Sequence, residues 1–210
     1  MYKLFYYPGN ANFAPHMMLE EIGAAHELVL VDRSVNAHKS PDYLALNPAG
    51  RIPVLVDGDL VLYETAAICL HLADKHPEAE LAPALGSPER ATFYRLLMFM
   101  TNTIQAEILA FFYTDRYTTD PDSVPAVRAG FVKRLDEWFG MMNDEVGAGP
   151  YLQGDFLTAA DFYLFMLVRF GRFLPDPPHE LGNLAPYVAR LSEHPAIVRA
   201  GEAEGLAAPY

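Results

Sequence analysis

Residues 47–65 have the sequence NPAGRIPVLVDGDLVLYET, and this stretch decides the fold of the first third of the chain. A turn-forming start leads into the apolar run 53–56, the Asp-Gly-Asp sequence at 57–59 and a second apolar run at 60–63. Glycine supplies the positive φ angle of a tight turn, so two short apolar runs around Asp-Gly predict a β-hairpin. The helix-forming residues 65–75 predict a helix directly after it.

The residues before the hairpin predict two further strands with a helix between them. Residues 3–7 form a compact apolar run, and residues 27–31 form a second strand rich in valine and leucine. Between them, Pro15 suits a first helical position and Gly23 ends the helix. A β–α–β unit of this length implies parallel strands joined by a right-handed crossover. Together with the hairpin it predicts an α/β layer with a mixed sheet.

The composition changes after residue 76. Residues 77–88 carry three prolines and a glycine, which is typical of a linker. Beyond it the chain shows long helical patterns and no convincing strand alternation; the patterns cover residues 89–112, 124–146 and 158–173, with two shorter ones near the C-terminus. The predicted domains are therefore residues 1–78 and 89–210, joined by a linker at 79–88.

The composition also limits the partners of this chain. Its 210 residues include 15 Lys plus Arg against 27 Asp plus Glu, which gives a net charge of −12. Such a surface repels phosphate backbones and anionic lipid headgroups, so we expect neither a nucleic-acid nor a membrane partner. The single cysteine, Cys69, allows no internal disulfide, no secretory signal opens the sequence, and the apolar stretch 162–173 is too short to span a bilayer. A cytoplasmic location is therefore expected.

Two parts of the quoted stretch resemble the glutathione-binding elements of cytosolic glutathione transferases. Residues 47–55 resemble the loop in which a cis-proline, here Pro53, follows a residue that pairs with the peptide. Ile52 would then offer its backbone N–H and C=O to an extended tripeptide. Glu64-Thr65 resembles the family's Glu-Ser/Thr pair, in which a carboxylate meets an ammonium group and a helix N-terminus receives a carboxylate. Taken singly, Pro53 also suits an edge strand and Thr65 an ordinary helix cap.

Other motifs extend the resemblance through nearly the whole chain. Residues 157–162 resemble the family's capping box, in which Thr158 caps a helix and Asp161 reaches back to the cap N–H. The opening residues 3–16 are most similar to the bacterial beta class. The resemblance implies an N-terminal thioredoxin-like domain with a mixed four-stranded sheet and a C-terminal helical bundle domain. It also implies a cytoplasmic homodimer, glutathione as co-substrate and a role in detoxification.

The resemblance breaks at the two groups that mark the beta class. Ala11 stands where these enzymes carry a cysteine and Leu109 where they carry a histidine, so the beta-class cysteine mechanism is not available. Asn102 matches a family asparagine that faces the site, and Lys39 or Arg33 is the candidate substitute for a lysine that contacts glutathione. The glutathione-binding residues implied by the resemblance are Ile52, Pro53, Glu64, Thr65, Lys39 and Asn102.

Activation of glutathione needs a group that favours its thiolate over its thiol. A free thiol with a pKa near 8.5 is only about 3% ionised at neutral pH, and a hydrogen bond to sulfur together with a helix N-terminus lowers that pKa. Tyr6 and Asn10 occupy the positions of the donors in tyrosine-type and serine-type transferases, and Asn12 lies one residue past the lost cysteine. These three are the candidate catalytic residues. Packing within the strand is the alternative for Tyr6, and an ordinary turn role is the alternative for both asparagines.

Aromatic residues near the end of the first long helix resemble the wall of the family's hydrophobic substrate pocket, although aromatic density at helical spacing also suits a core. The expected pocket residues are Phe13, Leu109, Phe112, Tyr113 and Tyr117. No metal is expected, because the spacing of His71, Asp74 and His76 matches no metal signature, and His16 is expected to pack near the start of its helix.

The sequence therefore predicts a glutathione transferase that conjugates the thiolate to small apolar electrophiles, or reduces peroxides or disulfides with it. The alternative is a transferase-fold protein that binds glutathione or a protein partner without much turnover. The absent cysteine and histidine favour this alternative, whereas the retained Pro53 and Glu64-Thr65 favour the enzyme. A glutathione-dependent isomerase or dehalogenase is a third hypothesis that the same motifs allow.

Overall fold

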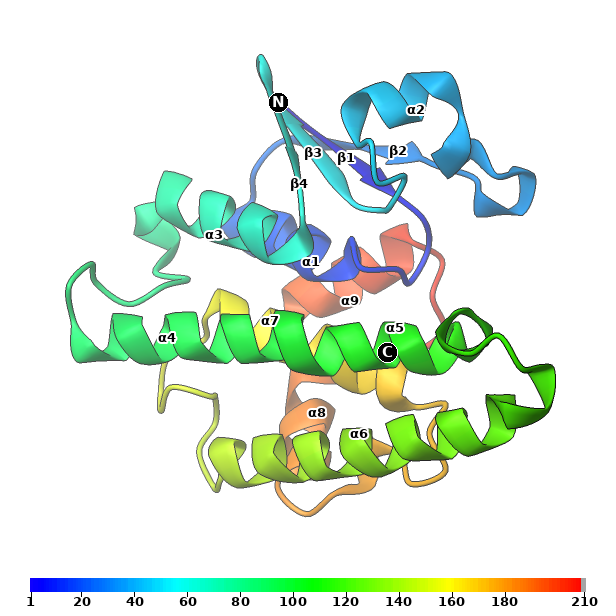
Figure 1. Cartoon of the computed structure of the whole chain (residues 1–210). Coiled ribbons are helices and arrows are strands. Elements are labelled where there is room, and N and C mark those ends of the chain that lie inside the picture. Colours follow the sequence, from blue (N-terminus) through cyan, green and yellow to red (C-terminus); the bar gives the residue numbers. More distant parts are fainter. Residues whose placement is uncertain (209–210) are drawn as a thin grey trace. The chain divides into compact units, whose positions relative to one another are not determined.

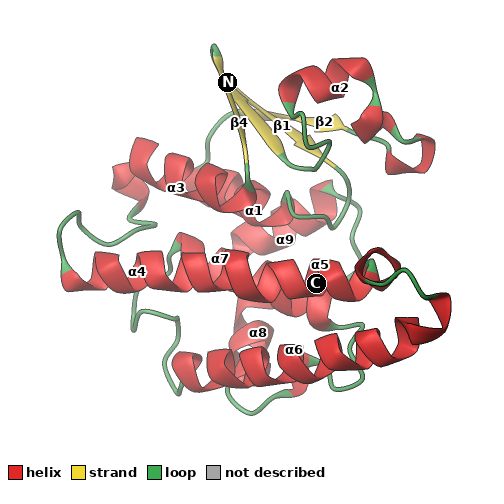
Figure 2. Cartoon of the chain, viewed as in Figure 1, coloured by secondary structure: helices red, strands yellow, loops and turns green. Residues whose placement is uncertain are grey.

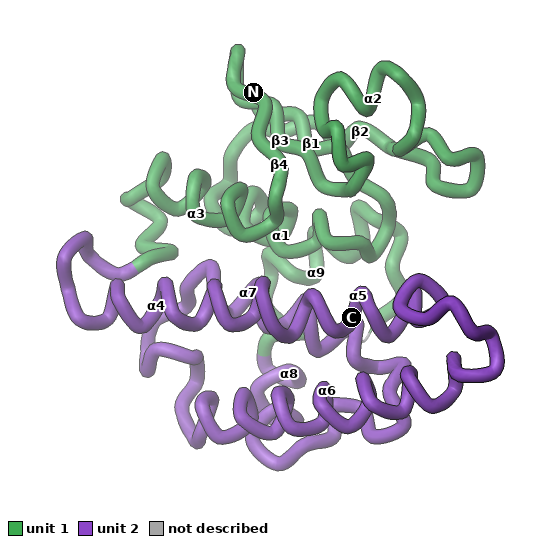
Figure 3. The backbone as a smooth tube through the Cα atoms, in the orientation of Figure 1, with its two compact units in different colours: residues 1–82, 191–210 green, residues 83–190 purple. Residues whose placement is uncertain are grey.

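The computed structural model describes residues 1–208, which form two compact units (Figure 3). One unit contains residues 1–82 together with the segment that begins at residue 191, and the other contains residues 83–190. The division between residues 82 and 83 falls inside the predicted linker. The prediction that all of residues 89–210 belong to the helical domain is wrong for the last part of the chain. Helix α9 (Pro195–Ala203) belongs to the N-terminal unit, where it packs against helix α1 (Phe13–Ile22).

The first unit contains the mixed four-stranded sheet expected from the sequence (Figures 1 and 2). Its strands, β1 (Tyr2–Tyr6), β2 (His26–Leu30), β3 (Val54–Asp57) and β4 (Leu60–Tyr63), lie in the order β2-β1-β3-β4. Strand β1 runs parallel to β2 and antiparallel to β3, and β3 with β4 forms the predicted hairpin. The thioredoxin-like topology is thereby confirmed.

Helices pack on this sheet because its strands bury side chains on both faces. Phe5 and Val54 belong to one apolar cluster with Tyr43, which lies on the short helix α2. Leu4 and Leu55, one residue out of phase, are fully buried on the opposite face, as the two-residue period of a strand requires. The remaining helical elements of this unit are α2 (Pro41–Leu46), α3 (Thr65–Lys75), which packs beside α1, and the 3-10 turns η1 (Arg33–Val35), η2 (Ala37–Lys39) and η3 (Pro77–Ala79).

The second unit is helical, as predicted. Its elements are α4 (Pro88–Phe99), the π-helical segment η4 (Met100–Gln105), α5 (Ala106–Phe112), η5 (Thr114–Tyr117), η6 (Pro121–Ser123), α6 (Val124–Val146), α7 (Ala159–Gly171), η7 (Pro178–Glu180) and α8 (Leu184–Ser192), whose end belongs to the first unit. The helix predicted over 89–112 is continuous, but residues 100–105 form a wider π-helical turn. Residues 159–168 of α7 are apolar almost all round, and all are buried. Among residues 1–208, no helix is both long enough and apolar enough to cross a bilayer.

The predicted capping box at the start of α7 is present. The Asp161 carboxylate accepts hydrogen bonds from the Thr158 N–H at 2.8 Å and the Thr158 hydroxyl at 3.0 Å. It also accepts from the Leu152 N–H at 2.8 Å and the Tyr187 hydroxyl at 2.9 Å. Burial raises the pKa of Asp161, and these four donors act in the opposite direction. One carboxyl group therefore joins the α7 start, the preceding loop and α8.

Candidate functional site

The loop before β3 presents an open stretch of backbone. The Ile52–Pro53 peptide bond is cis, as the resemblance predicted. The side chain of Ile52 packs in the apolar cluster with Tyr43, while no residue within 1–208 hydrogen-bonds to its N–H or C=O. These backbone groups lie directly before β3, so an extended peptide can pair with them as an added strand.

Asn47 holds the loop in this conformation. Its side-chain amide donates to the Arg51 carbonyl at 2.8 Å, and its side-chain oxygen accepts the Ala49 N–H at 3.0 Å. The Tyr43 hydroxyl donates to the same Arg51 carbonyl at 2.8 Å, and burial raises the pKa of that hydroxyl. The sequence indicated only that Asn47 favours a turn; its burial, at 2% exposure, shows it as the centre of the loop.

Lys39 lies beside the same loop. Its ammonium group donates to the Ala49 carbonyl at 3.3 Å, and its side chain is exposed. The close approach needs Gly50, because a Cβ at that position would lie 2.6 Å from the Lys39 Nζ and 2.8 Å from the His38 carbonyl oxygen. A positive charge is thus available at the loop that precedes Ile52 for an anionic ligand group.

Glu64 and Thr65 form the junction between β4 and α3. Glu64 has φ +75° and ψ 114°, a backbone conformation that residues other than glycine seldom adopt. Its carboxylate is exposed, and no side chain in the described part of the chain pairs with it. Strained residues of this kind cluster at ligand clamps.

Thr65 is the first residue of α3 and is 5% exposed. Its hydroxyl donates to the Ala11 carbonyl at 3.2 Å, so it connects α3 to the loop after β1. The backbone N–H groups of the first turn of α3 are then the groups that can receive an anion at this junction. The junction therefore offers a carboxylate and a helix N-terminus side by side, which suits the ammonium and carboxylate of an amino acid.

The three candidate donors differ sharply in accessibility. Tyr6 ends β1 and is partly exposed, with its carbonyl accepting the Val31 N–H at 2.8 Å. Asn10 is also partly exposed; its side-chain oxygen accepts the Ala11 N–H at 2.8 Å, and no hydrogen bond engages its amide nitrogen within residues 1–208. Both side chains therefore retain a donor for a ligand.

The structure contradicts the prediction that Asn12 donates a hydrogen bond to the sulfur of glutathione. Asn12 is 0% exposed, its side-chain oxygen accepts the Tyr7 N–H at 3.1 Å, and its amide nitrogen donates to Glu204 at 2.8 Å. A side chain sealed in this way cannot touch the sulfur of a bound ligand. Asn12 instead shapes the loop between β1 and α1.

Glu204, at the end of α9, organises the same loop. Its side chain is fully buried and accepts hydrogen bonds from the Gly9 N–H at 2.7 Å, the Asn12 amide at 2.8 Å and the His16 Nδ1 at 2.7 Å. The sequence analysis missed this residue as part of the site. Residues 204–206 belong to the stretches that resemble the family, but no local spacing connects Glu204 with its three partners, which lie 188 to 195 residues earlier in the chain.

The helical unit carries most of the expected pocket residues. Phe112 is 38% exposed and stacks edge to face on Phe173 at 5.7 Å, and Tyr117 is 55% exposed and stacks on Phe131 at 5.3 Å. Leu109 and Tyr113 are partly buried, and Asn102 is exposed on η4. Phe131, which is buried on α6, and Phe173, which lies exposed in the turn after α7, were not singled out from the sequence, because they reach Tyr117 and Phe112 from other parts of the chain.

The structure contradicts the prediction that Phe13 lines the substrate pocket. Phe13 is the first residue of α1 and is 0% exposed, so it belongs to the interior rather than to a surface that a substrate contacts.

Tyr113 has a charged neighbour, since the Arg116 guanidinium lies 4.1 Å from the centre of its ring. The exposed aromatic surface of this unit is therefore built from α5, η5 and their neighbours.

Comparisons with known proteins extend over nearly the whole chain. The family model "Glutathione S-transferase, N-terminal domain" matches residues 1–74, and "Glutathione S-transferase, C-terminal domain" matches residues 104–200. The protein named glutathione S-transferase GstA from Escherichia coli O157:H7 is 32% identical over 206 residues, which cover 97% of this chain and 99% of that relative.

Solved structures show the same similarity. A sphingomonad glutathione S-transferase complexed with glutathione matches with a TM-score of 0.84 and 29% identity, covering 98% of this chain and 100% of its own. A bacterial beta-class glutathione S-transferase from Sphingomonas chungbukensis matches with a TM-score of 0.84 and 30% identity, with the same coverage of 98% and 100%. These similarities agree with the family resemblance inferred from the motifs.

Proposed function

Because the chain belongs to the glutathione S-transferase family, we propose that it binds glutathione in its N-terminal unit and activates the thiol for chemistry. The backbone of Ile52 pairs with the extended tripeptide, next to the cis-linked Pro53. Glu64 binds the ammonium group, and the N-terminus of α3, beginning at Thr65, receives a carboxylate. Lys39 neutralises the other carboxylate. The observation that carries this proposal is the Glu64 carboxylate, which pairs with no side chain among residues 1–208 and is held in a strained conformation beside that helix end.

The proposed reaction is transfer of the glutathione thiolate to a small apolar electrophile, or reduction of a peroxide or disulfide. Lowering the thiol pKa by about two units requires roughly 3 kcal/mol of preference for the thiolate. A hydrogen bond from Tyr6 or Asn10, together with the N-terminus of α1, supplies preference of this kind. The partly exposed Leu109, Phe112, Tyr113 and Tyr117 are proposed to bind the electrophile, and Asn102 to assist glutathione binding. We further propose a cytoplasmic homodimer with a role in detoxification.

A second candidate function is glutathione binding without much turnover. Ala11 and Leu109 favour it, since they replace the cysteine and histidine expected of the beta class. The two candidates differ in the thiol pKa of the bound glutathione, which is lowered only by an activating site.

Replacement of Glu64 by glutamine is expected to weaken glutathione binding about 10- to 100-fold, or about 1.4–2.8 kcal/mol, because the ammonium group loses its charged partner. Isothermal titration calorimetry measures this directly. Glu80→Gln is a matched control, since Glu80 is also an exposed glutamate with a positive φ angle, 52°. Equal affinity of wild type and Glu64→Gln would contradict the assigned role of Glu64.

The side chain that activates the thiol is expected to be identified by the thiol pKa of bound glutathione, which is measured from the pH dependence of thiolate absorbance in the complex. Tyr6→Phe and Asn10→Ala remove one donor each, and the variant that lacks the true donor is expected to raise the bound thiol pKa by about one unit or more while glutathione affinity changes little. Asn12→Ala is not informative here because Asn12 is buried. A wild-type complex with an unshifted thiol pKa would favour the binding protein over the enzyme.

A further inference from the structure

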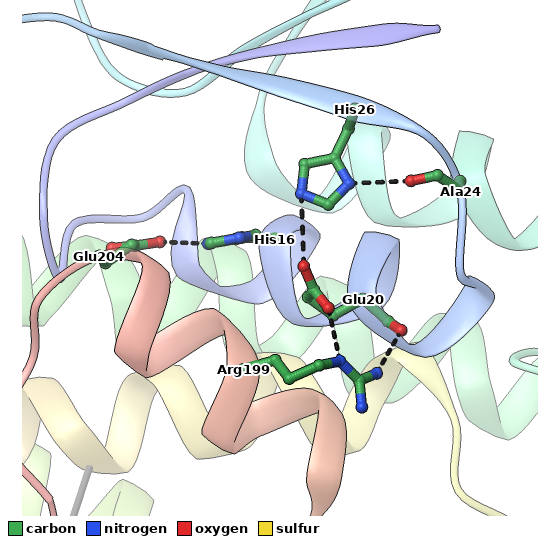
Figure 4. A network of polar contacts seen from close by, with 6 residues as sticks. All are labelled: His16, Glu20, Ala24, His26, Arg199 and Glu204. Carbon is green, nitrogen blue, oxygen red and sulfur yellow. Dashed lines mark hydrogen bonds and ion pairs between the residues drawn. The ribbon is translucent and has the colours of Figure 1, made fainter.

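Three potential metal ligands meet where α1 turns into β2 (Figure 4). His16 and Glu20 lie four residues apart, and therefore on one face of α1, while His26 begins β2. Ligand atoms of the three residues all lie within 4.8 Å of one another. The His26 Nε2 and a Glu20 carboxylate oxygen are 3.6 Å apart, near the roughly 3.3 Å that separates two ligands of a tetrahedral zinc ion.

The hydrogen bonds around both histidines leave Nε2 as the nitrogen available to a ligand. The His26 Nδ1 lies 2.8 Å from the Ala24 carbonyl, which only accepts, so Nδ1 carries the proton and Nε2 the lone pair. The His16 Nδ1 lies 2.7 Å from the Glu204 carboxylate, which fixes the same tautomer. Histidines that bind metals usually have their second nitrogen held by a carbonyl or a carboxylate in this way.

The His16 Nε2 is a second, independent observation that points to a bound ion at this cluster. His16 is 0% exposed, and its Nε2 has no hydrogen-bond partner within residues 1–208. A buried polar atom of this kind is uncommon and calls for a ligand or an ion. Because the contact with Glu204 places the proton on Nδ1, Nε2 carries a lone pair, and a metal cation is a group that binds a lone pair.

The charges of the surroundings also suit a dication. The Glu20 carboxylate joins the cluster, and the Glu204 carboxylate lies directly behind His16. Arg199 balances one of these charges; its Nε donates to the Glu20 Oε2 at 2.6 Å and its guanidinium also donates to the Glu20 carbonyl at 2.7 Å. The second Glu20 oxygen thus remains directed at the cluster while Arg199 orients the carboxylate.

We propose that the Nε2 atoms of His16 and His26 and a carboxylate oxygen of Glu20 bind a divalent transition-metal ion, with Zn²⁺ as the best match. Two imidazoles with one carboxylate are a ligand set that zinc prefers, and a water molecule completes its four-fold coordination. His26 and Glu20 are partly exposed, which gives the ion access from solvent. The bound ion ties α1 to β2 and, through His16 and Glu204, supports the loop that carries Asn10.

The test is a titration of the tag-free, glutathione-free full chain with Co²⁺ and then with Zn²⁺ as competitor. We expect one equivalent of Co²⁺ to bind with the visible absorption of a four-coordinate site, and Zn²⁺ to displace it and raise Tm. His26→Ala and Glu20→Gln are each expected to weaken binding at least tenfold and to abolish the rise in Tm. His71→Ala is the control, because His71 lies on α3 of the same unit and pairs with Asp57 away from the cluster.

His16 is left intact in this test, because its replacement also removes a buried contact of Glu204. Circular dichroism of the metal-free variants checks that each one is folded. Unchanged binding in both His26→Ala and Glu20→Gln would overturn the proposal, as would the absence of binding at millimolar metal. Neither result bears on glutathione binding, which the Glu64 experiment tests separately.

Discussion

Glu204→Ala is expected to lower the free energy of unfolding by about 3–5 kcal/mol, because two buried donors and one partly buried donor lose their shared acceptor. These donors are the Gly9 N–H, the Asn12 amide and the His16 Nδ1, each within 2.8 Å of the Glu204 carboxylate. Water cannot replace the lost acceptor without opening the contact between α1 and α9. The loop that carries Asn10 loses its support at the same time, so weaker glutathione binding is also expected.

Urea unfolding followed by circular dichroism, together with Tm, measures the loss of stability. Glu202→Ala is the matched control, because Glu202 lies on the same helix and is exposed. Its effect is expected to stay within about 0.5 kcal/mol. A Glu204→Ala protein as stable as Glu202→Ala would mean that water satisfies the three donors and that α9 contributes little to the first unit.

Asp161→Ala is expected to destabilise the helical unit by a similar amount, about 3–5 kcal/mol. Four hydrogen bonds lose their acceptor, and three of the donors belong to Leu152 and Thr158, which precede α7. The fourth donor is the Tyr187 hydroxyl of α8. Since residues 159–168 of α7 are all buried, loss of its cap is expected to loosen the centre of the unit.

The same urea experiment measures this effect, and Asp155→Ala is its control because Asp155 is an exposed aspartate in the loop before α7. The pH dependence gives a second readout. Burial raises the folded-state pKa of Asp161, so the folded chain binds this proton more tightly than the unfolded chain. Its contribution to stability is therefore complete below the unfolded pKa and declines as pH rises through the folded pKa; Asp161→Ala is expected to lack this slope.

Local motifs were predictable where neighbouring residues supply both halves of an interaction. The hairpin β3–β4 follows from Asp57-Gly58 between two apolar runs, and its register brings Asp57 opposite Leu60. The capping box follows from Thr158 and Asp161, three residues apart. In both cases the geometry of a turn or a helix start brings the partners together without help from the rest of the chain.

The errors arose where burial depends on distant residues. Asn12 and Phe13 lie two and three residues after Asn10, and their sequence neighbours did not indicate that both side chains would be fully buried. Asn12 is enclosed because Glu204 approaches from the other end of the chain. The expectation that no metal binds stays untested; it rested on the spacing of neighbouring residues, whereas the His16, Glu20 and His26 cluster forms only when β2 folds back beside α1.

The sequence by itself determined the order of the four strands with α1 and α3, the hairpin and the capping box, since each depends on dihedral preferences and contacts within a few residues. The Glu64-Thr65 junction was recognised only by its resemblance to the family's Glu-Ser/Thr pair, because a φ of +75° at Glu64 runs against the ordinary preference of a glutamate. Tertiary structure alone decided that α9 joins the N-terminal unit, that Glu204 holds the loop after β1, and that Asn10 rather than Asn12 remains accessible. The physical reason is that the cost of burying a polar group depends on which partners reach it. For Asn12 and His16 that partner is Glu204, almost the full length of the chain away.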